Sequence, residues 1–235
     1  MSLEYMGDIP LQIAIDGPVA AGKGDVASRL AKKLHLTYIY TGAMYRMLAL
    51  ACINNTIVSK DHDQVLNLLT NISMDLAPPD ISSQWPCRAL LNGQDVTERI
   101  FSQDVAIGAS DVGVIPEVRK IMVTLQQNMV QGKSVVMEGR DIGSRVLPKA
   151  QLKIFLTADL EERAKRRYLQ WKQNGIDKSF TETLTDTKMR DFQDVTRKTD
   201  PLQKMPDAWE LDTTNKTQDQ VVDAIINELK KRQLV

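Results

Sequence analysis

A glycine-rich segment near the start of the chain carries the residue types that bind phosphate groups. Its glycines and lysine are spaced as Gly, four residues, Gly-Lys, and the segment is Gly17-Pro18-Val19-Ala20-Ala21-Gly22-Lys23-Gly24. Glycines let successive backbone N–H groups turn toward one anion, and the start of a following helix adds partial positive charge. Lys23 supplies a mobile cation for β and γ phosphates. The spacing therefore predicts a phosphate-binding loop rather than a turn that merely uses glycines.

The residues after this lysine depart from the usual form of such a loop. A Ser or Thr that ligates magnesium commonly follows the Gly-Lys pair, whereas Gly24 and Asp25 stand here. A carboxylate at a helix start is electrostatically favourable, but it repels a nearby phosphate. We therefore expect Asp25 either to face away from the phosphate or to hold magnesium through water.

Two arginines and an aspartate late in the chain form a second candidate site. Arg190, Asp194 and Arg197 are spaced i, i+4 and i+7, which predicts one face of a helix. Two guanidinium groups can clamp a phosphate, and a carboxylate can accept hydrogen bonds from ribose hydroxyls. Taken alone, such a triad is more typical of a solvated ion-pair stripe. The phosphate loop in the same chain favours the binding site.

A further arginine cluster lies on one face of a predicted helix, at Arg163, Arg166 and Arg167. Phosphoryl transfer spreads negative charge over the moving group, so its catalysis needs positioned cations and exclusion of water. A mobile lid helix would supply both, and the alternative is a capped surface helix with a charged face. Arg46 and Arg140 each follow a glycine-containing turn and are candidates for the same centre.

Alternating strands and helices are predicted to position these residues. Apolar residues indicate a short buried strand at Leu11–Asp16 before the loop, and their helical spacing indicates a helix at Lys23–Leu34 after it. A strand at Thr37–Tyr40 and a helix that ends near Asn54-Asn55 follow. Strands joined by helical crossovers predict an α/β fold, a mostly parallel sheet with helices on both faces.

Between residues 65 and 104 the pattern changes to short segments separated by turn residues. Pro78-Pro79 and Asn92-Gly93 punctuate this stretch, which predicts a small antiparallel insert with a hairpin at Asn92-Gly93. The sequence thus divides into a core, residues 11–64 and 105–235, and an insert, residues 65–104.

The remaining core is predicted from helix caps and apolar runs. Pro116 and Gly132 bracket a helix. The later elements are strands at Ser134–Met137, Leu152–Leu156 and Trp209–Leu211, and helices with capping boxes at Asp159/Glu162, Ser179/Glu182 and Thr217/Gln220, the first of them closed by Asn174-Gly175.

Composition excludes several classes of protein. The chain has 235 residues, 43% hydrophobic and 26% charged, which is typical of a globular protein and not of a disordered or repeat protein. Thirty basic residues balance thirty acidic ones, so we expect no attraction to nucleic acid or to a membrane. Two histidines and two cysteines, Cys52 and Cys87, fit neither a zinc site nor a disulfide framework. Cysteines that only pack are typical of the cytoplasm, which we therefore expect.

Over essentially its whole length, from Ile13 to Leu211, the chain resembles the bacterial cytidylate kinase family. Besides the loop, the segment Thr41-Gly42-Ala43-Met44-Tyr45-Arg46 is similar to the family's acceptor-site segment. Glu138-Gly139-Arg140-Asp141 resembles its Asp-Gly-Arg-Asp, with Glu in place of the first acid. The resemblance implies a P-loop kinase fold, in which residues 65–104 form the monophosphate-binding insert and residues 160–180 a helical lid.

The resemblance also implies roles for individual residues. Asp194 with Arg190 would hold the sugar of a nucleoside monophosphate, and Arg197 would hold its phosphate. The implied nucleotide-binding residues are Gly17, Pro18, Val19, Ala20, Ala21, Gly22, Lys23, Gly24 and Asp25, and the implied catalytic residues are Lys23, Arg140, Arg163, Arg167 and Arg190. The implied substrate-binding residues are Thr41, Arg46, Ser110, Arg119, Arg140, Asp141, Arg190, Asp194 and Arg197.

Three of these residues suit a cytosine ring. In the family the positions of Ser110 and Arg119 read the base, and cytosine offers an exocyclic amine as donor with a ring nitrogen and a carbonyl as acceptors. Asp141 matches the donor, and the other two match the acceptors. Uracil would place a carbonyl opposite Asp141 and leave two acceptors facing each other, so we expect cytosine to be preferred.

The expected activity is ATP-dependent phosphorylation of CMP and dCMP to CDP and dCDP, by direct in-line transfer with magnesium and without a histidine base. We assign no protein ligands for the metal. The expected partners are small molecules, with no nucleic acid or membrane, and the expected state is a monomer. Alternatives are a P-loop kinase for another monophosphate or a metabolite hydroxyl, a guanine-nucleotide switch, and a homologue that binds nucleotide without turnover. The switch would need an Asn-Lys-x-Asp segment, and Asn215-Lys216-Thr217-Gln218 fails at its fourth position.

Overall fold

The computed structural model describes residues 9–80, 83, 85–173 and 175–235. The chain divides into two compact units, the first made of residues 1–36 and 133–235 and the second of residues 37–132. The predicted helix stop at Asn174 lies outside the described residues, whereas its neighbour Gly175 has a φ of +71°.

A parallel β-sheet forms the centre of the first unit. Its strands are β1 (Gln12–Asp16), β6 (Val135–Gly139), β7 (Leu152–Thr157) and β8 (Trp209–Asp212), in the spatial order β6-β1-β7-β8. In β1 the consecutive residues Ile13, Ala14 and Ile15 are all fully buried. Both faces of this strand are therefore covered, as is usual in parallel sheets.

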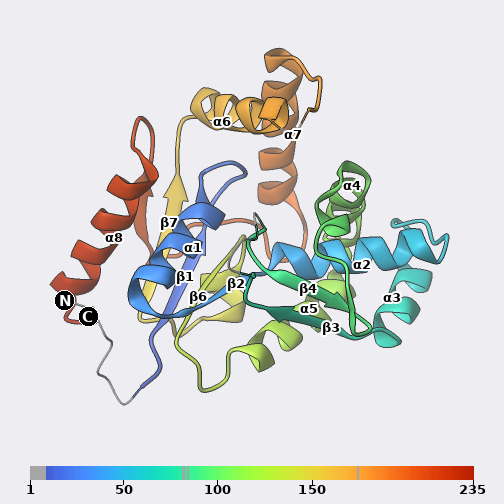
Figure 1. Ribbon diagram of the computed structural model, residues 1–235, viewed down its shortest axis with the longest axis horizontal. Helices are drawn as coiled ribbons and strands as arrows, with labels where there is room; N and C mark the ends of the chain where they lie inside the picture. Colours follow the sequence, from blue (N-terminus) through green and yellow to red (C-terminus); the bar gives the residue numbers. More distant parts are fainter. Residues whose placement is uncertain (1–8, 81–82, 84, 174) are drawn as a thin grey trace. The chain divides into compact units, whose positions relative to one another are not determined.

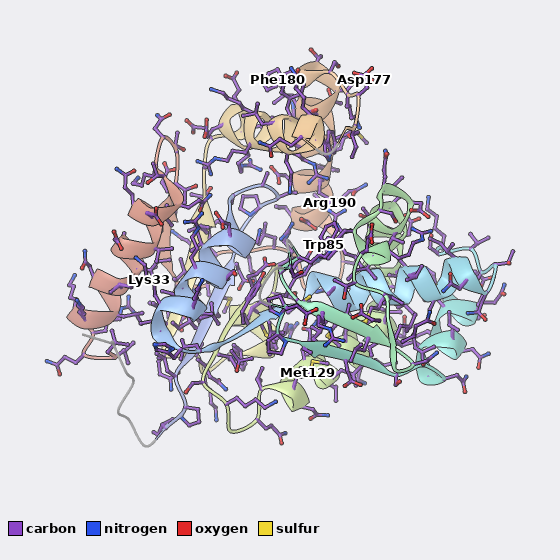
Figure 2. All side chains as sticks on the ribbon, viewed as in Figure 1. Lys33, Trp85, Met129, Asp177, Phe180 and Arg190 are labelled. Carbon is purple, nitrogen blue, oxygen red and sulfur yellow. The ribbon has the colours of Figure 1, made fainter. Side chains whose placement is uncertain are left out.

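Helices and one short π-helical turn complete the first unit. They are α1 (Lys23–Leu34), η2 (Ile142–Val146), α6 (Leu160–Gln173), α7 (Phe180–Thr196) and α8 (Gln218–Lys231). Helix α8 lies beside α1, and the surface ion pairs Arg29–Asp219 and Lys33–Asp223 join the two (Figures 1 and 2). Helices α6 and α7 pack against each other (Figure 1). The capping boxes predicted for α7 and α8 are both confirmed.

The second unit combines helices with a small antiparallel sheet. Its helices are α2 (Gly42–Asn54), α3 (His62–Thr70), η1 (Arg99–Phe101), α4 (Gln103–Val112) and α5 (Pro116–Met129), and its strands are β2 (Thr37–Tyr40), β3 (Met74–Ala77), β4 (Arg88–Leu91) and β5 (Gln94–Asp95). Strands β3, β4 and β5 are antiparallel neighbours. The hairpin at Asn92-Gly93 is confirmed, with φ angles of +52° and +79° that suit a tight β-turn.

The core of the second unit gathers around α2. Met44, Met47 and Leu48 of this helix are fully buried, and α4 packs along it. Cys52 and Cys87 belong to the same core, where burial raises the pKa of their thiols to about 11 and about 12. Both thiols stay protonated near neutrality, which fits packing residues rather than nucleophiles.

The α/β fold, with a parallel sheet and a separate small antiparallel sheet, is as predicted, but two helices were not. Helix α3 is capped by Asp61, whose side chain accepts the Gln64 N–H, and it buries only Val65 and Leu69. Helix α4 contains Gly108, so its apolar spacing is weak. The unit of residues 37–132 contains the predicted insert, residues 65–104, whose narrower bounds stay a prediction.

No helix among the described residues combines the length and apolar character that a membrane crossing needs.

Candidate active site

The phosphate-binding loop connects the end of β1 to the start of α1. Gly17 has a φ of +151° and Gly22 one of +92°, backbone conformations that other residues rarely adopt. A Cβ on Gly17 would lie 2.0 Å from the carbonyl oxygen of Leu156 in β7. Glycine is therefore required at Gly17 both by conformation and by the close approach of a neighbouring strand.

Lys23 folds back onto its own loop. Its Nζ donates to the carbonyl oxygens of Gly17, at 2.8 Å, and Pro18, at 2.7 Å. Burial, and after it the charge of Arg140, lowers the pKa of the Lys23 ammonium to about 7, against the opposing effect of nearby carboxylates. The ammonium can exchange these two carbonyl oxygens for the oxygens of a bound phosphate.

Asp16, the last residue of β1, fixes the chain that follows β6. Its carboxylate accepts hydrogen bonds from the N–H groups of Ile142, at 2.8 Å, and Gly143, at 2.7 Å. Burial raises the pKa of Asp16 to about 6, although these N–H groups act in the opposite direction. Because Asp16 pairs with Gly139 in the sheet, the turn containing Arg140 begins beside the phosphate loop. Asp16 was missed as a site residue, and its position at the carboxyl end of a strand was the available signal.

Three arginines surround the buried carboxylate of Asp194 on α7. Arg140 Nε donates to its Oδ2 at 2.6 Å, while Arg197 Nη1 and Arg190 Nε lie 3.8 Å and 3.9 Å from its Oδ1. Burial favours the neutral acid, but the charges of Arg140, Arg190 and Arg197 prevail and lower the pKa of Asp194. Arg190 lies on α7 (Figure 2). The three arginines form a concentrated cationic group suited to phosphate.

One detail of the predicted triad is wrong. Helix α7 ends at Thr196, and Arg197 has an extended backbone with φ −59° and ψ 142°, so it does not share a helical face with Arg190. Its Nε instead donates to the carbonyl oxygen of Asp200 at 2.6 Å. Arg197 Nη2 also lies 3.9 Å from Oδ1 of Asp141, so a turn rather than a helix brings these charges together.

The arginines of α6 have separate partners. Arg163 is only 6% exposed, which excludes a surface role for it. Arg166 donates to Glu162 at 2.9 Å and to the hydroxyl of Thr213 at 2.9 Å. The guanidinium of Arg167 lies 4.7 Å from the ring centre of Trp171, a cation–π contact. The interpretation as a charged surface face is therefore wrong for Arg163.

Thr213 is a supporting residue that the sequence did not reveal. It follows β8 and is 2% exposed. Its Oγ1 lies 3.0 Å from the carbonyl oxygen of Thr157 and 3.3 Å from that of Ala21 in the phosphate loop. No local pattern marks it, because its contacts join segments far apart in the chain.

Within the second unit, Thr41 and Arg46 lie at the start of α2. Thr41 is buried at the residue before the helix. Arg46 Nη1 donates to the carbonyl oxygen of Ile100 at 2.8 Å, and its guanidinium lies 5.4 Å from the ring centre of Phe101. The Arg46 side chain is thus held in a defined position.

Ser110 and Arg119, the predicted base-contacting residues of this unit, come from consecutive helices. Ser110 donates to the carbonyl oxygen of Ala106 at 3.2 Å within α4. Arg119 is 2% exposed, and its Nη1 donates to the carbonyl oxygen of Gly113, just past the end of α4. The fold therefore ties Arg119 to the end of the helix that carries Ser110.

Asp25 is turned toward the protein surface. Its Oδ1 accepts from Arg29 Nε at 3.1 Å, and its side chain is 49% exposed. Arg29 also binds Asp219 of α8. Of the two expectations for Asp25, the structure supports the one in which its carboxylate faces away.

Replacing Asp25 by asparagine is expected to leave the phosphoryl-transfer rate within about threefold of wild type, because an exposed ion pair contributes little. Steady-state kinetics at saturating nucleotide measure this. A loss of about 30-fold or more would instead mean that the carboxylate acts on phosphate or on its metal ion.

Comparison with known proteins identifies the family. The family model for cytidylate kinase matches residues 13–231. The chain belongs to the cytidylate kinase family. The cytidylate kinase of Caldicellulosiruptor saccharolyticus is 44% identical over 216 residues, 92% of this chain and 94% of that protein. Those of Caldanaerobacter subterraneus and Limosilactobacillus reuteri are 42% and 43% identical, over 96% and 95% of this chain and 97% and 96% of theirs.

Family membership makes this chain a nucleoside monophosphate kinase, and so a nucleotide-using phosphotransferase. The loop at Gly17–Asp25 begins at the carboxyl end of β1, where α/β sheets commonly bind their ligands.

Proposed function

We propose that this kinase transfers the γ-phosphoryl group of ATP to CMP and dCMP, forming CDP and dCDP. The observation that carries the proposal is the buried Lys23 ammonium, held within a glycine-rich loop at the carboxyl end of β1. A cation so placed meets the β and γ phosphates of a donor nucleotide.

The donor is held chiefly by the loop from Gly17 to Asp25. Backbone N–H groups and the start of α1 bind its phosphates, and Lys23 leaves its carbonyl partners to follow the moving charge. Arg163 and Arg167 of the predicted lid, residues 160–180, supply further positive charge and exclude water when the lid closes. These residues stabilise a transition state whose charge is spread over the phosphoryl oxygens.

The acceptor's phosphate and sugar are assigned to the charged residues around Asp194. Arg197 and Arg140 neutralise its phosphate, and Asp194 together with Arg190 holds the sugar. Thr41 and Arg46 contact the monophosphate. Holding donor and acceptor phosphates in line makes transfer effectively unimolecular, so neither a covalent intermediate nor a histidine base is required.

Three side chains select the base. Asp141 accepts from the exocyclic amine of cytosine, while Arg119 and Ser110 donate to its ring nitrogen and carbonyl. Uracil offers Asp141 an acceptor, which leaves two acceptors unsatisfied and disfavours UMP.

Magnesium fits this site as an ion that arrives with ATP. Among the described residues, no group of three or more His, Cys, Asp or Glu side chains could hold a metal. Magnesium commonly keeps several waters and binds phosphate oxygens with few protein ligands. The ion would help neutralise the negative charge of the triphosphate. Asp16 is the carboxylate that immediately precedes the loop.

A coupled assay of ADP release with ATP and magnesium tests the proposal. CMP, dCMP, UMP and AMP are compared as acceptors, with Lys23→Ala as the blank. Turnover confined to CMP and dCMP is expected. Preference for UMP or AMP would overturn the assignment of Asp141, Arg119 and Ser110 to cytosine. Folded protein that binds CMP without turnover would identify a nucleotide-binding homologue and overturn the kinase proposal.

A further inference from the structure

Asp191 of α7 contacts the phosphate loop directly, although no motif marks it. Its Oδ1 accepts the backbone N–H of Val19 at 3.3 Å, and its Oδ2 accepts from Arg163 Nη1 at 2.6 Å. The same Nη1 donates to the carbonyl oxygen of Val19 at 3.2 Å. Asp191 and Arg163 therefore bind both polar groups of one loop residue.

The hydrogen bonds among Arg163, Asp191 and Val19 connect three separate elements. Arg163 comes from α6, Asp191 from α7 and Val19 from the loop between β1 and α1. Arg163 Nε is also occupied, since it donates to the carbonyl oxygen of Ala158 at 2.9 Å. These acceptors orient the whole guanidinium plane, because it is rigid and its donors point in fixed directions.

Burial makes this orientation depend on Asp191. The side chains of Arg163 and Asp191 are only 8% and 20% exposed, so water competes weakly for their hydrogen bond. Arg163 uses Nε and Nη1 for protein acceptors, and within the described part of the chain no hydrogen bond involves its Nη2. The two N–H groups of Nη2 therefore remain to be offered to a phosphate oxygen.

We propose that Asp191 is a positioning residue for phosphoryl transfer, which holds Arg163 against the phosphate loop so that Nη2 meets the donor phosphates. This inference rests on the proposed function. Asp191 touches neither substrate and acts only through Arg163 and Val19. It should therefore influence the transfer step much more than the binding of the acceptor nucleotide.

Asp191→Asn is the sharpest test, because the amide keeps the size of the side chain and removes the charge that holds Arg163. In the full chain, kcat is expected to fall between about 10-fold and 100-fold, since small misplacements of catalytic groups cost this much. KM for CMP should change less than about twofold. Asp191→Glu, which keeps the charge, should recover part of kcat.

Asp186→Asn is the matched control. Asp186 lies on the same helix and pairs with Lys178, but its side chain is 45% exposed, and among the described residues no hydrogen bond or ion pair joins it to the loop. Its kinetics should equal those of wild type. Thermal melting of each variant separates loss of folding from loss of positioning, and exchange of the Val19 amide hydrogen in Asp191→Asn should be faster than in wild type.

A double-mutant cycle with Arg163→Met tests whether Asp191 affects kcat through Arg163. If Asp191 acts through Arg163, the double variant is no slower than Arg163→Met alone. Independent, multiplying losses would overturn the inference, as would a folded Asp191→Asn enzyme with wild-type kcat. Failure of the proposed function is distinct, because it would appear as absent turnover of CMP by the wild-type chain.

Discussion

Replacing Lys23 by methionine is expected to lower kcat by about 1000-fold, because the variant loses the positive charge of the phosphate-binding segment. The other charged residue of this segment, Asp25, faces outward. Methionine keeps the unbranched shape of the side chain, so the buried site stays filled. Coupled ADP release with CMP measures the effect. A folded variant with more than about a tenth of wild-type activity would contradict the role of Lys23.

Lys23→Met should also change how the free energy of unfolding depends on pH. Burial and Arg140 lower the pKa of Lys23 to about 7, whereas an unfolded lysine holds its proton up to its ordinary pKa of 10.5. Between these values the unfolded chain binds more protons, so this group makes stability rise with pH. Urea unfolding at pH 7 and pH 9 should therefore show wild type gaining stability relative to Lys23→Met as the pH is raised. No difference in slope would mean that Lys23 is not perturbed in the folded protein.

The second large effect is expected for Asp194→Ala, which should destabilise the protein by about 3 kcal/mol because it leaves the partly buried arginines around it uncompensated. Activity with CMP should fall by about 100-fold or more, as both the sugar contact and the arrangement of Arg140 are lost. Chemical unfolding and steady-state kinetics measure the two effects. A variant with wild-type stability would show that the arginines do not depend on this carboxylate.

Asp223→Asn is the control for that experiment. Asp223 also pairs with a basic residue, Lys33, but the pair lies on the surface of α8 and α1 and should be dispensable.

Lowering the pH should remove the stabilising contribution of the Asp194 carboxylate. Its folded pKa lies below the ordinary 3.8, so its stabilising contribution is fully present above about pH 3.8 and is lost as the pH falls through the folded value. Asp16 behaves in the opposite way. Burial raises its pKa to about 6, so its ionisation costs stability as the pH rises from 3.8 toward 6.

The elements that local signals specify were predicted closely. Helix α1 has the predicted bounds, Lys23–Leu34, because its apolar residues repeat at helical spacing. The capping boxes of α7 and α8 and the turn at Asn92-Gly93 depend on residues within a few positions of each other. Helices α3 and α4 were missed because each buries few residues and so leaves a weak periodic pattern.

In the candidate site, too, features within one segment were predictable and contacts between distant segments were not. The position of Lys23 and the glycines in a loop between β1 and α1 could be predicted from the sequence, since spacing within one segment specifies the loop. The residue types around Asp194 were also evident, but the geometry that joins them was not. Arg140 comes from another element, and Arg197 reaches the cluster through a turn instead of a helical face.

The sequence by itself thus determined the phosphate loop, most of the secondary structure and the family resemblance, because these follow from short-range spacing. Only the tertiary structure decided which way Asp25 faces, that Arg163 is buried, and that Asp16 and Asp191 hold the polar groups around the loop. The physical reason is that a carboxylate's role depends on which distant N–H groups and guanidinium groups the fold brings within hydrogen-bond distance of it.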